Sequence, residues 1–213
     1  MTVAMLIGLW TYDEFSFNKY HQNYDRIAQV MQPQTFNGEP GSSVAVHPVM
    51  AEGIRNIYGG DFKYVVQSSW TNNHILTVDE KAFAKTGNYF DPQVTEMLSL
   101  KMLKGTRAGL IEPYSILLSE SVASVYFGDA DPLGKMIKID NKHEVKVTGV
   151  YEDLPHNSTF KDVSFILPWE LFRIQNPWIK DAKNIWSDNF TLTYAMVADN
   201  ADMGKVSEKI KNI

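Results

Sequence analysis

Residues 117–159 constrain the fold of this 213-residue chain more than any other segment, because several kinds of local structure follow one another there. Ser119 is typical of a helix N-cap, whose hydroxyl accepts a hydrogen bond from a backbone N–H of the first turn. Glu120 then stands at the positive end of the helix dipole. Gly128 occupies the position where a left-handed residue ends a helix, and Pro132 prevents the helix from resuming. The segment therefore predicts a short helix that ends in a tight turn.

Two alternating runs follow this turn. Residues 137–140 and 145–148 alternate apolar and polar side chains on either side of Asn141-Lys142. Such runs predict a β-hairpin with one buried face. Gly149 interrupts the second run, as glycine does at a bulge or at a close approach of two backbones.

The remaining chain mixes helices and strands. Helices are predicted at residues 17–31, 48–58, 168–172 and 202–213, strands at 62–70, 162–167 and 190–197, and a loop at 36–43. We expect residues 74–78 to pair with the strand at 62–70, and residues 94–103 fit either a helix or a strand. Strands separated by helices in this order indicate an α+β domain.

Composition excludes some classes of protein and leaves others open. The chain is long enough for one large or two small domains. Its net charge of −5 argues against a nucleic-acid partner, because neutralising phosphates requires a basic face. The absence of cysteine excludes disulfides, thiolate catalysis and Cys-ligated metals, and it indicates no particular compartment.

The first twelve residues, MTVAMLIGLWTY, are apolar and uncharged. This run is shorter than the ~20 residues that span a bilayer, and it lacks the basic region and cleavage site of a signal peptide. Trp10 and Tyr12, followed by Asp13 and Glu14, are typical of a helix that leaves the membrane through an aromatic belt. A buried N-terminal helix or strand is the alternative.

No catalytic, cofactor or metal site emerges from the residues. The five histidines show no HxH or HExxH spacing, and His21 is expected to be a partly buried polar residue. Ser119 and Ser121 lack a nucleophile elbow, and Glu152 and Asp153 fit a solvated turn. Without a phosphate-binding glycine loop, any ATP would be hydrolysed by another chain or domain.

Three further short features bear on binding or modification. Residues 174–186 carry Trp178 and Trp186 without clean periodicity, which suggests a surface anchor for a partner. Residues 157–159 and 189–191 match the glycosylation triplet, but such triplets are common by chance and we assign them no role. Asp13, Glu14, Asp25 and Arg26 fit a charged, solvated helix face, with an interface as the alternative.

Two blocks of short motifs give a more specific indication. The first consists of Asp13-Glu14-Phe15-Ser16-Phe17-Asn18-Lys19-Tyr20-His21 and Asp25-Arg26-Ile27. The second consists of Ser119-Glu120-Ser121-x-Ala123, Tyr126-Phe127-Gly128, Asp131-Pro132-Leu133-Gly134-Lys135, Val147-x-Gly149-Val150 and Asp153-Leu154-Pro155. In this order and spacing, the motifs resemble the extracytoplasmic core domain of MacB/FtsX-type ABC transporter permeases. With weaker matches elsewhere, the likeness covers nearly the whole chain.

The resemblance implies a fold and a set of structural residues. It implies a two-lobed α+β domain in which both chain ends (13–85 and 160–213) form a βα-sandwich lobe and residues 86–159 form an inserted β-rich lobe. Residues 1–12 would be the end of a clipped transmembrane helix. The residues expected to have structural roles are Asp13, Glu14, Phe17, Asp25, Arg26, Phe127, Gly128, Asp131, Pro132, Gly134, Gly149, Val150, Asp153 and Pro155.

The resemblance also implies a function without catalysis or cofactor. The domain would lie on the periplasmic side of a bacterial inner membrane and couple ATP-driven motion to export or to a periplasmic partner. Its expected partners are a cytoplasmic ABC ATPase, a second permease copy, and a periplasmic adaptor, lipoprotein or outer-membrane channel. A membrane-tethered ligand-binding sensor and, less favoured, a periplasmic hydrolase are the alternatives.

Overall fold

The computed structural model describes residues 2–179 and 188–213. The helices are α1 (Thr2–Phe15), α2 (Met50–Tyr58), α3 (Val94–Met97), α4 (Glu120–Phe127), α5 (Trp169–Gln175) and α7 (Met203–Lys209), with 3-10 turns η1 (Tyr24–Arg26), η2 (Gly59–Asp61), η3 (Arg107–Leu110) and η4 (Ile210–Asn212). The strands are β1 (Ile27–Gln29), β2 (Gln32–Phe36), β3 (Glu39–Ser43), β4 (Phe62–Ser68), β5 (Asn72–Val78), β6 (Lys81–Phe90), β7 (Met102–Gly105), β8 (Ser115–Ser119), β9 (Met136–Ile139), β10 (His143–Tyr151), β11 (Phe165–Pro168) and β12 (Leu192–Val197). The fold is α+β, as the sequence predicts.

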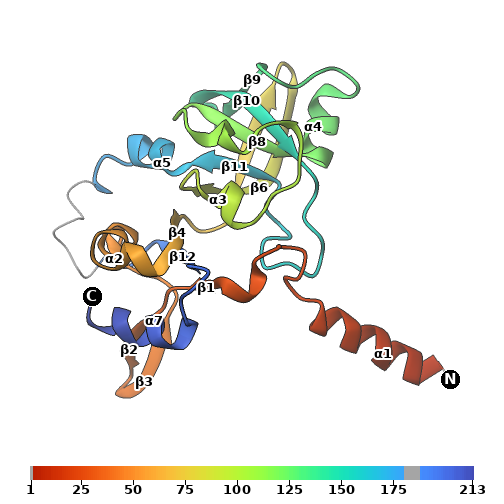
Figure 1. Ribbon diagram of the computed structural model, residues 1–213. Helices are drawn as coiled ribbons and strands as arrows, with labels where there is room; N and C mark the ends of the chain where they lie inside the picture. The colour runs from red at the N-terminus through yellow and green to blue at the C-terminus, as the bar shows by residue number, and fades with distance from the viewer. Residues whose placement is uncertain (1, 180–187) are drawn as a thin grey trace.

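Six strands close into a ring in the order β6-β11-β8-β10-β9-β5, because β5 pairs with both β9 and β6 (Figure 1). Apolar side chains fill the ring, among them Ile137 and Ile139, which are 0% and 1% exposed. The predicted hairpin is thus confirmed as β9 and β10. Helix α4 packs Val122 and Tyr126 against the same core, and the Tyr126 hydroxyl donates to Leu76 O at 2.7 Å.

A smaller group of elements, which we call the terminal unit, comes from both chain ends. Strands β1, β12 and β4 continue the sheet, and α2 and α7 lie on one face of it (Figure 1). Ile54 of α2 packs there with Val65 and Ala195, and Ile210 joins them. Strands β4 and β6 pair at one position, Ser68 with Phe90, and an apolar core shared by the terminal unit and the ring includes Val66, Phe90 and Ile166. The residue boundaries expected for two lobes stay predictions.

Gly149 lies at a close approach of two backbones. The sequence leaves this and a bulge open as the two interpretations of a glycine here. It pairs with Gly105 of β7, and the register of β10 against β8 shifts at this point. A Cβ atom on Gly149 would lie 2.8 Å from Leu117 Cδ2, and one on Gly105 would lie 2.3 Å from the backbone oxygen of Thr148. Only glycine therefore allows β7 to lie this close to β10.

The helix predicted at 17–31 is wrong. Residues 24–26 form η1 and residues 27–29 form β1. Asn18 has a φ of 61°, which no right-handed helix accommodates. The spacing of apolar residues mimics a helical face, but β1 pairs with β12, so contacts distant in sequence override the local pattern.

Two other expectations need correction. Residues 74–78 do form a strand, but β5 pairs with β6 and β9 and not with β4. Residues 36–43, expected as a loop, contain β3, which forms a hairpin with β2 around Asn37 and Gly38. Both turn residues have positive φ, the geometry that Asn-Gly favours in two-residue hairpins. The ambiguous segment 94–103 resolves into α3 followed by the start of β7.

Candidate functional site: the root of helix α1

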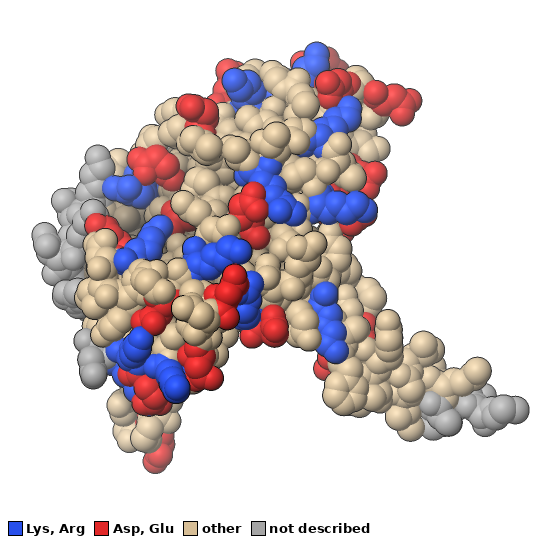
Figure 2. Space-filling view, viewed as in Figure 1, with Lys and Arg blue, Asp and Glu red and all other residues tan. Residues whose placement is uncertain are grey.

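Helix α1 projects from the body of the molecule (Figure 1). Figure 2 shows this arm largely in tan, whereas basic and acidic side chains are interspersed over the body. The exposed fractions of its apolar side chains range from 58% at Ile7 to 73% at Tyr12 and Phe15. A helix that is apolar on all sides is stable when apolar surroundings cover it. Among the described residues no helix is long and apolar enough to cross a membrane.

The segment after α1 is fastened to a loop about 140 positions later in the chain. We call residues 13–21 and 152–160 together the α1 clasp. Asn18 N–H donates to Asn157 O at 2.8 Å, and the Asn18 side chain both accepts from Thr159 N at 2.8 Å and donates to Thr159 Oγ1 at 2.9 Å. Asn157 Nδ2 returns a hydrogen bond to Ser16 Oγ at 2.8 Å. The positive φ of Asn18 allows this reciprocal pairing.

His21 forms the buried part of the clasp and is 2% exposed. Its Nδ1 lies 2.8 Å from Leu98 O, so this nitrogen carries the proton and donates. Its Nε2 lies 3.0 Å from Ser158 Oγ and accepts the hydroxyl proton. Burial lowers the pKa of His21, and the hydrogen bond to Leu98 partly opposes this. The neutral imidazole therefore fits the closed clasp.

The clasp should weaken in acid. The pKa of His21 in the fold lies below its ordinary value of 6.5. Below pH 6.5, His21 therefore binds a proton more readily when the clasp is open than when it is closed. Stability present above pH 6.5 is then lost as the pH falls toward the lowered pKa. We expect hydrogen exchange of residues 16–21 and 156–160 to quicken between pH 7.5 and 5.5, relative to the intrinsic rates. If a His21→Gln variant shows the same increase, another group is responsible.

Charged side chains add further contacts within the clasp. Glu152 accepts from Lys101 Nζ at 2.6 Å and from the Tyr20 hydroxyl at 3.1 Å. These two hydrogen bonds lower the pKa of Glu152, whereas burial and then Glu152 raise the pKa of Tyr20 to about 12. Asp13 lies 2.7 Å from His156 Nε2. These contacts fix the end of α1 to the loop.

The same loop continues to helix α4. Asp153 Oδ1 accepts from Ser121 Oγ at 2.9 Å and from Ser121 N at 3.2 Å, in the first turn of α4. Ser119 is the N-cap, as the sequence predicts, and accepts from Val122 N. A continuous set of contacts thus runs from α1 through the clasp to the helix that packs on the ring core.

The structure separates the sequence-predicted residues into three groups. Asp13, Glu14, Phe17, Asp153 and Pro155 belong to the clasp, in which Glu14 is exposed. Phe127, Gly128, Asp131, Pro132, Gly134, Gly149 and Val150 lie along α4, its following turn and β10. Asp25 and Arg26 lie in η1, away from the clasp, where Arg26 pairs with Asp199.

The turn after α4 is held to its neighbours. Gly128 and Gly134 have φ values of 57° and 76°, and Gly134 N donates to Val147 O at 2.8 Å. Asp131 accepts from Lys104 Nζ at 3.0 Å, which lowers the pKa of Asp131. These contacts hold the turn against β7 and β10, and the structural roles expected for its residues stay predictions.

Trp178 is half exposed and its ring centroid lies 4.8 Å from that of Phe190. Trp186 lies outside the described residues. The sequence places Asn18 inside a motif but does not single it out, and it assigns no role to Asn157 or Ser158. The triplet at 157–159 was noticed only as a chance glycosylation match, although a polar Asn-Ser-Thr run after the Asp-Leu-Pro motif is a signal of a structured loop.

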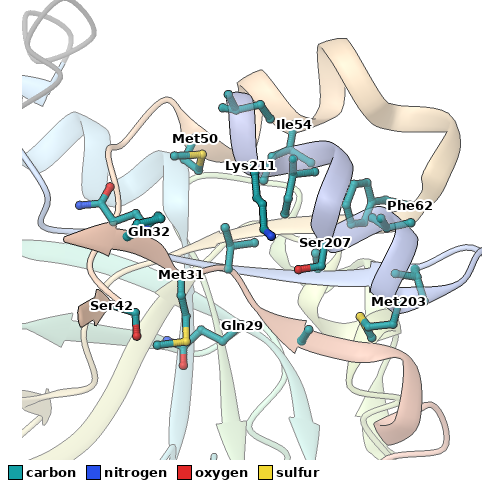
Figure 3. A pocket seen from close by; sticks show the side chains of 18 of the residues that line it. Gln29, Met31, Gln32, Ser42, Met50, Ile54, Phe62, Met203, Ser207 and Lys211 are labelled. Carbon is teal, nitrogen blue, oxygen red and sulfur yellow. The ribbon is translucent and has the colours of Figure 1, made fainter. Parts of the chain in front are cut away.

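Two cavities bear on the alternative functions. One of about 430 Å³ lies between β1, α2 and α7 (Figure 3). Its wall is mostly apolar, with Met31, Ile54 and Phe62 among the side chains and Phe62 as the aromatic one. These residues do not form an aromatic-rich cleft, the feature that would favour a ligand-binding sensor.

The other cavity holds a histidine–carboxylate pair, with His74 Nδ1 at 2.7 Å from Asp140 Oδ2. The residues that line it include no serine, threonine or cysteine to act as a nucleophile. Among residues 2–179 and 188–213, no cluster of acidic and histidine side chains is suited to hold a metal ion.

Comparison with known proteins gives a consistent result. The family model described as the MacB-like periplasmic core domain matches residues 1–213. A crystal structure described as a domain of a "putative Permease protein" from Porphyromonas gingivalis aligns with 21% identity and a TM-score of 0.69 over 90% of this chain and 82% of that one. The periplasmic region of MacB from Actinobacillus actinomycetemcomitans aligns with 15% identity and a TM-score of 0.63, over 88% and 81% of the two chains.

A third structure, the extracellular domain of the noncanonic ABC-type transporter YknZ from Gram-positive bacteria, aligns with 14% identity and a TM-score of 0.60, over 87% of this chain and 92% of that one. At these identities the structural likeness concerns the fold. No curated protein sequence matches the chain.

Proposed function

Since this chain belongs to the family of MacB-like periplasmic core domains of ABC transporter permeases, we propose that it transmits motion of the membrane helices to a substrate or partner outside the membrane. The family assignment made from the motifs is confirmed. This family consists of permease domains and not of enzymes. We therefore interpret the residues by how they transmit motion and which surfaces they offer to partners.

The α1 clasp is the observation that supports this proposal. In the proposed arrangement, α1 is the end of a membrane-spanning helix, whose apolar side chains lie in lipid. A displacement of α1 reaches residues 152–160 through the reciprocal Asn18 and Asn157 hydrogen bonds and reaches α4 through Asp153. Short hydrogen bonds between well-packed elements transmit such a displacement better than an unstructured linker.

The other parts of the machine lie outside this domain. A separate cytoplasmic ATPase binds and hydrolyses ATP, and a second permease copy stands beside this one in the inner membrane. The ring of one permease copy then changes its distance from the ring of the second copy. This motion expels a substrate through a channel or switches a bound adaptor or lipoprotein.

Distance measurement in the full-length permease with its ATPase tests this function. This domain contains no cysteine, so Asn141→Cys, on the exposed turn between β9 and β10, places one spin label on each copy once any cysteines elsewhere in the permease and the ATPase have been replaced. We expect the label-to-label distance to change between the ATP-bound and ADP-bound states. Equal distances in the two states would contradict the transmission of motion.

The surface around Trp178 is the proposed partner contact. Trp178 is half exposed and packs on Phe190, and exposed tryptophans commonly contribute more than ~1 kcal/mol to an interface. Replacing Trp178 and Trp186 by Ala should weaken the binding of a periplasmic partner at least tenfold without loss of the fold, which thermal unfolding of the domain checks. Unchanged affinity of the doubly substituted permease would rule out this surface.

A further inference from the structure

A polar cavity of about 300 Å³ lies where the terminal unit meets the ring. We call it the junction cavity. Arg55 from α2, Gln67 from β4, Asp91 after β6, and Trp169 and Arg173 from α5 line it. Ligand cavities occur preferentially between such structural units, and this one lies beside the single paired position of β4 and β6.

Gln67 is 1% exposed and leaves its side-chain nitrogen without a partner among the described residues. Its backbone N donates to Asp91 Oδ2 at 2.9 Å, its backbone O accepts from Asp91 N at 3.0 Å, and its Oε1 accepts from Thr193 Oγ1 at 3.5 Å. Its Nε2 is buried and has no hydrogen-bond partner among the described residues. An unpaired buried donor of this kind is destabilising, and an acceptor from a ligand would remove that cost.

The two arginines also have donors to spare. Arg55 uses Nε on Ala51 O and Nη2 on Asp91 Oδ2, each at 3.1 Å. Arg173 uses Nη1 on Glu170 Oε2 at 2.9 Å. Each guanidinium offers five N–H groups, so both retain donors beyond these bonds. Glu52, which lines the same cavity, already has an interaction of its own.

We propose that the junction cavity binds a small organic carboxylate. One ligand carboxylate accepts from the Gln67 amide and the Arg173 guanidinium, whose planar fork matches two carboxylate oxygens. Arg55, which also lines the cavity, offers a further donor, and the buried Trp169 ring supplies an apolar wall for the carbon skeleton. The volume of the cavity corresponds to a metabolite and is too small for a folded partner.

Such a ligand would connect α2 with α5, which belong to the two parts of the molecule that share one β4–β6 pair. Its binding would therefore strengthen the junction without touching the α1 clasp. The proposal is independent of the transport function and can fail or succeed by itself.

Calorimetry and thermal unfolding of the purified domain test the site, with acetate, succinate, L-glutamate and inorganic phosphate at equal ionic strength as probes. We expect succinate or glutamate to bind and to raise Tm. Arg173→Gln and Gln67→Met should each weaken binding about tenfold, the effect of ~1.4 kcal/mol. The matched control Arg107→Gln, which removes a guanidinium outside the cavity, should bind like the unchanged protein.

Gln67→Met removes the buried orphan donor but also the acceptor of the Thr193 hydroxyl, so the Tm of this variant without ligand is measured beside its affinity. If Gln67→Met does not fold, Arg173→Gln and its control still decide the question. The proposal is overturned if none of the carboxylates binds, if Arg173→Gln and Arg107→Gln bind equally well, or if phosphate binds more tightly than every carboxylate.

Discussion

Replacing Leu6, Ile7 and Leu9 by Glu is expected to abolish binding of the domain to phosphatidylcholine vesicles, whereas the unchanged chain floats with them in a density gradient. These three side chains are 58–66% exposed on an arm that contacts the body only at its root. Burying a large aliphatic side chain in an apolar phase gains about 1.5–3 kcal/mol, and placing a charge there costs a similar amount. We therefore expect affinity to fall by at least a hundredfold.

A matched control separates membrane affinity from added charge. Ile57, Ile111 and Met136 are 64%, 66% and 48% exposed on the body. Their replacement by Glu adds the same charge and should leave vesicle binding intact. If the unchanged chain does not bind vesicles, α1 is covered by protein, as in the alternative of a buried N-terminal helix, and the membrane assignment of residues 1–12 is wrong.

The elements that were predictable from the sequence are those fixed by neighbours in the chain. Helix α4 follows from its cap at Ser119 and its stop at Gly128, and the β9–β10 hairpin follows from alternation over a few residues. Local hydrogen bonds decide these structures, so local sequence contains the information.

The clasp could not be predicted because its partners lie far apart in the chain. The apolar spacing at 17–31 suits a helix, but Asn18 adopts a positive φ in order to pair with residues 157 and 159. The motif blocks around Asp13 and Asp153 were identified separately, and only the fold brings them together. Likewise, β5 pairs with β6 and β9 because ring closure, a property of the whole sheet, determines its neighbours.

Asn18→Ala is the most direct test of the clasp, because this residue combines backbone and side-chain roles. The substitution removes two side-chain hydrogen bonds. It also places alanine, which disfavours left-handed backbone, at a φ of 61°. The lost bonds cost about 1–3 kcal/mol, and the left-handed conformation costs roughly 1–2 kcal/mol more. Hydrogen exchange should quicken at 16–21 and 157–160 and stay slow in the ring.

Asn18→Gly separates the two contributions. Glycine tolerates the positive φ, so this variant should lose only the side-chain hydrogen bonds and show about half the local destabilisation. Lys209→Ala, which removes the remote ion pair with Asp61, controls for general effects on the domain and should leave the clasp unchanged.

In the full-length permease, an opened clasp should uncouple the domain from the membrane helices. We expect Asn18→Ala to retain ATP hydrolysis but to reduce the nucleotide-dependent distance change between Asn141→Cys labels, with Asn18→Gly intermediate and Lys209→Ala unaffected. The order of these variants matters, because a path that bypasses the clasp predicts the same distance change in all of them. If local exchange quickens as expected and the distance change persists, the motion reaches the ring by another route, and the contacts of Asn18 and Asn157 serve only to fasten the loop.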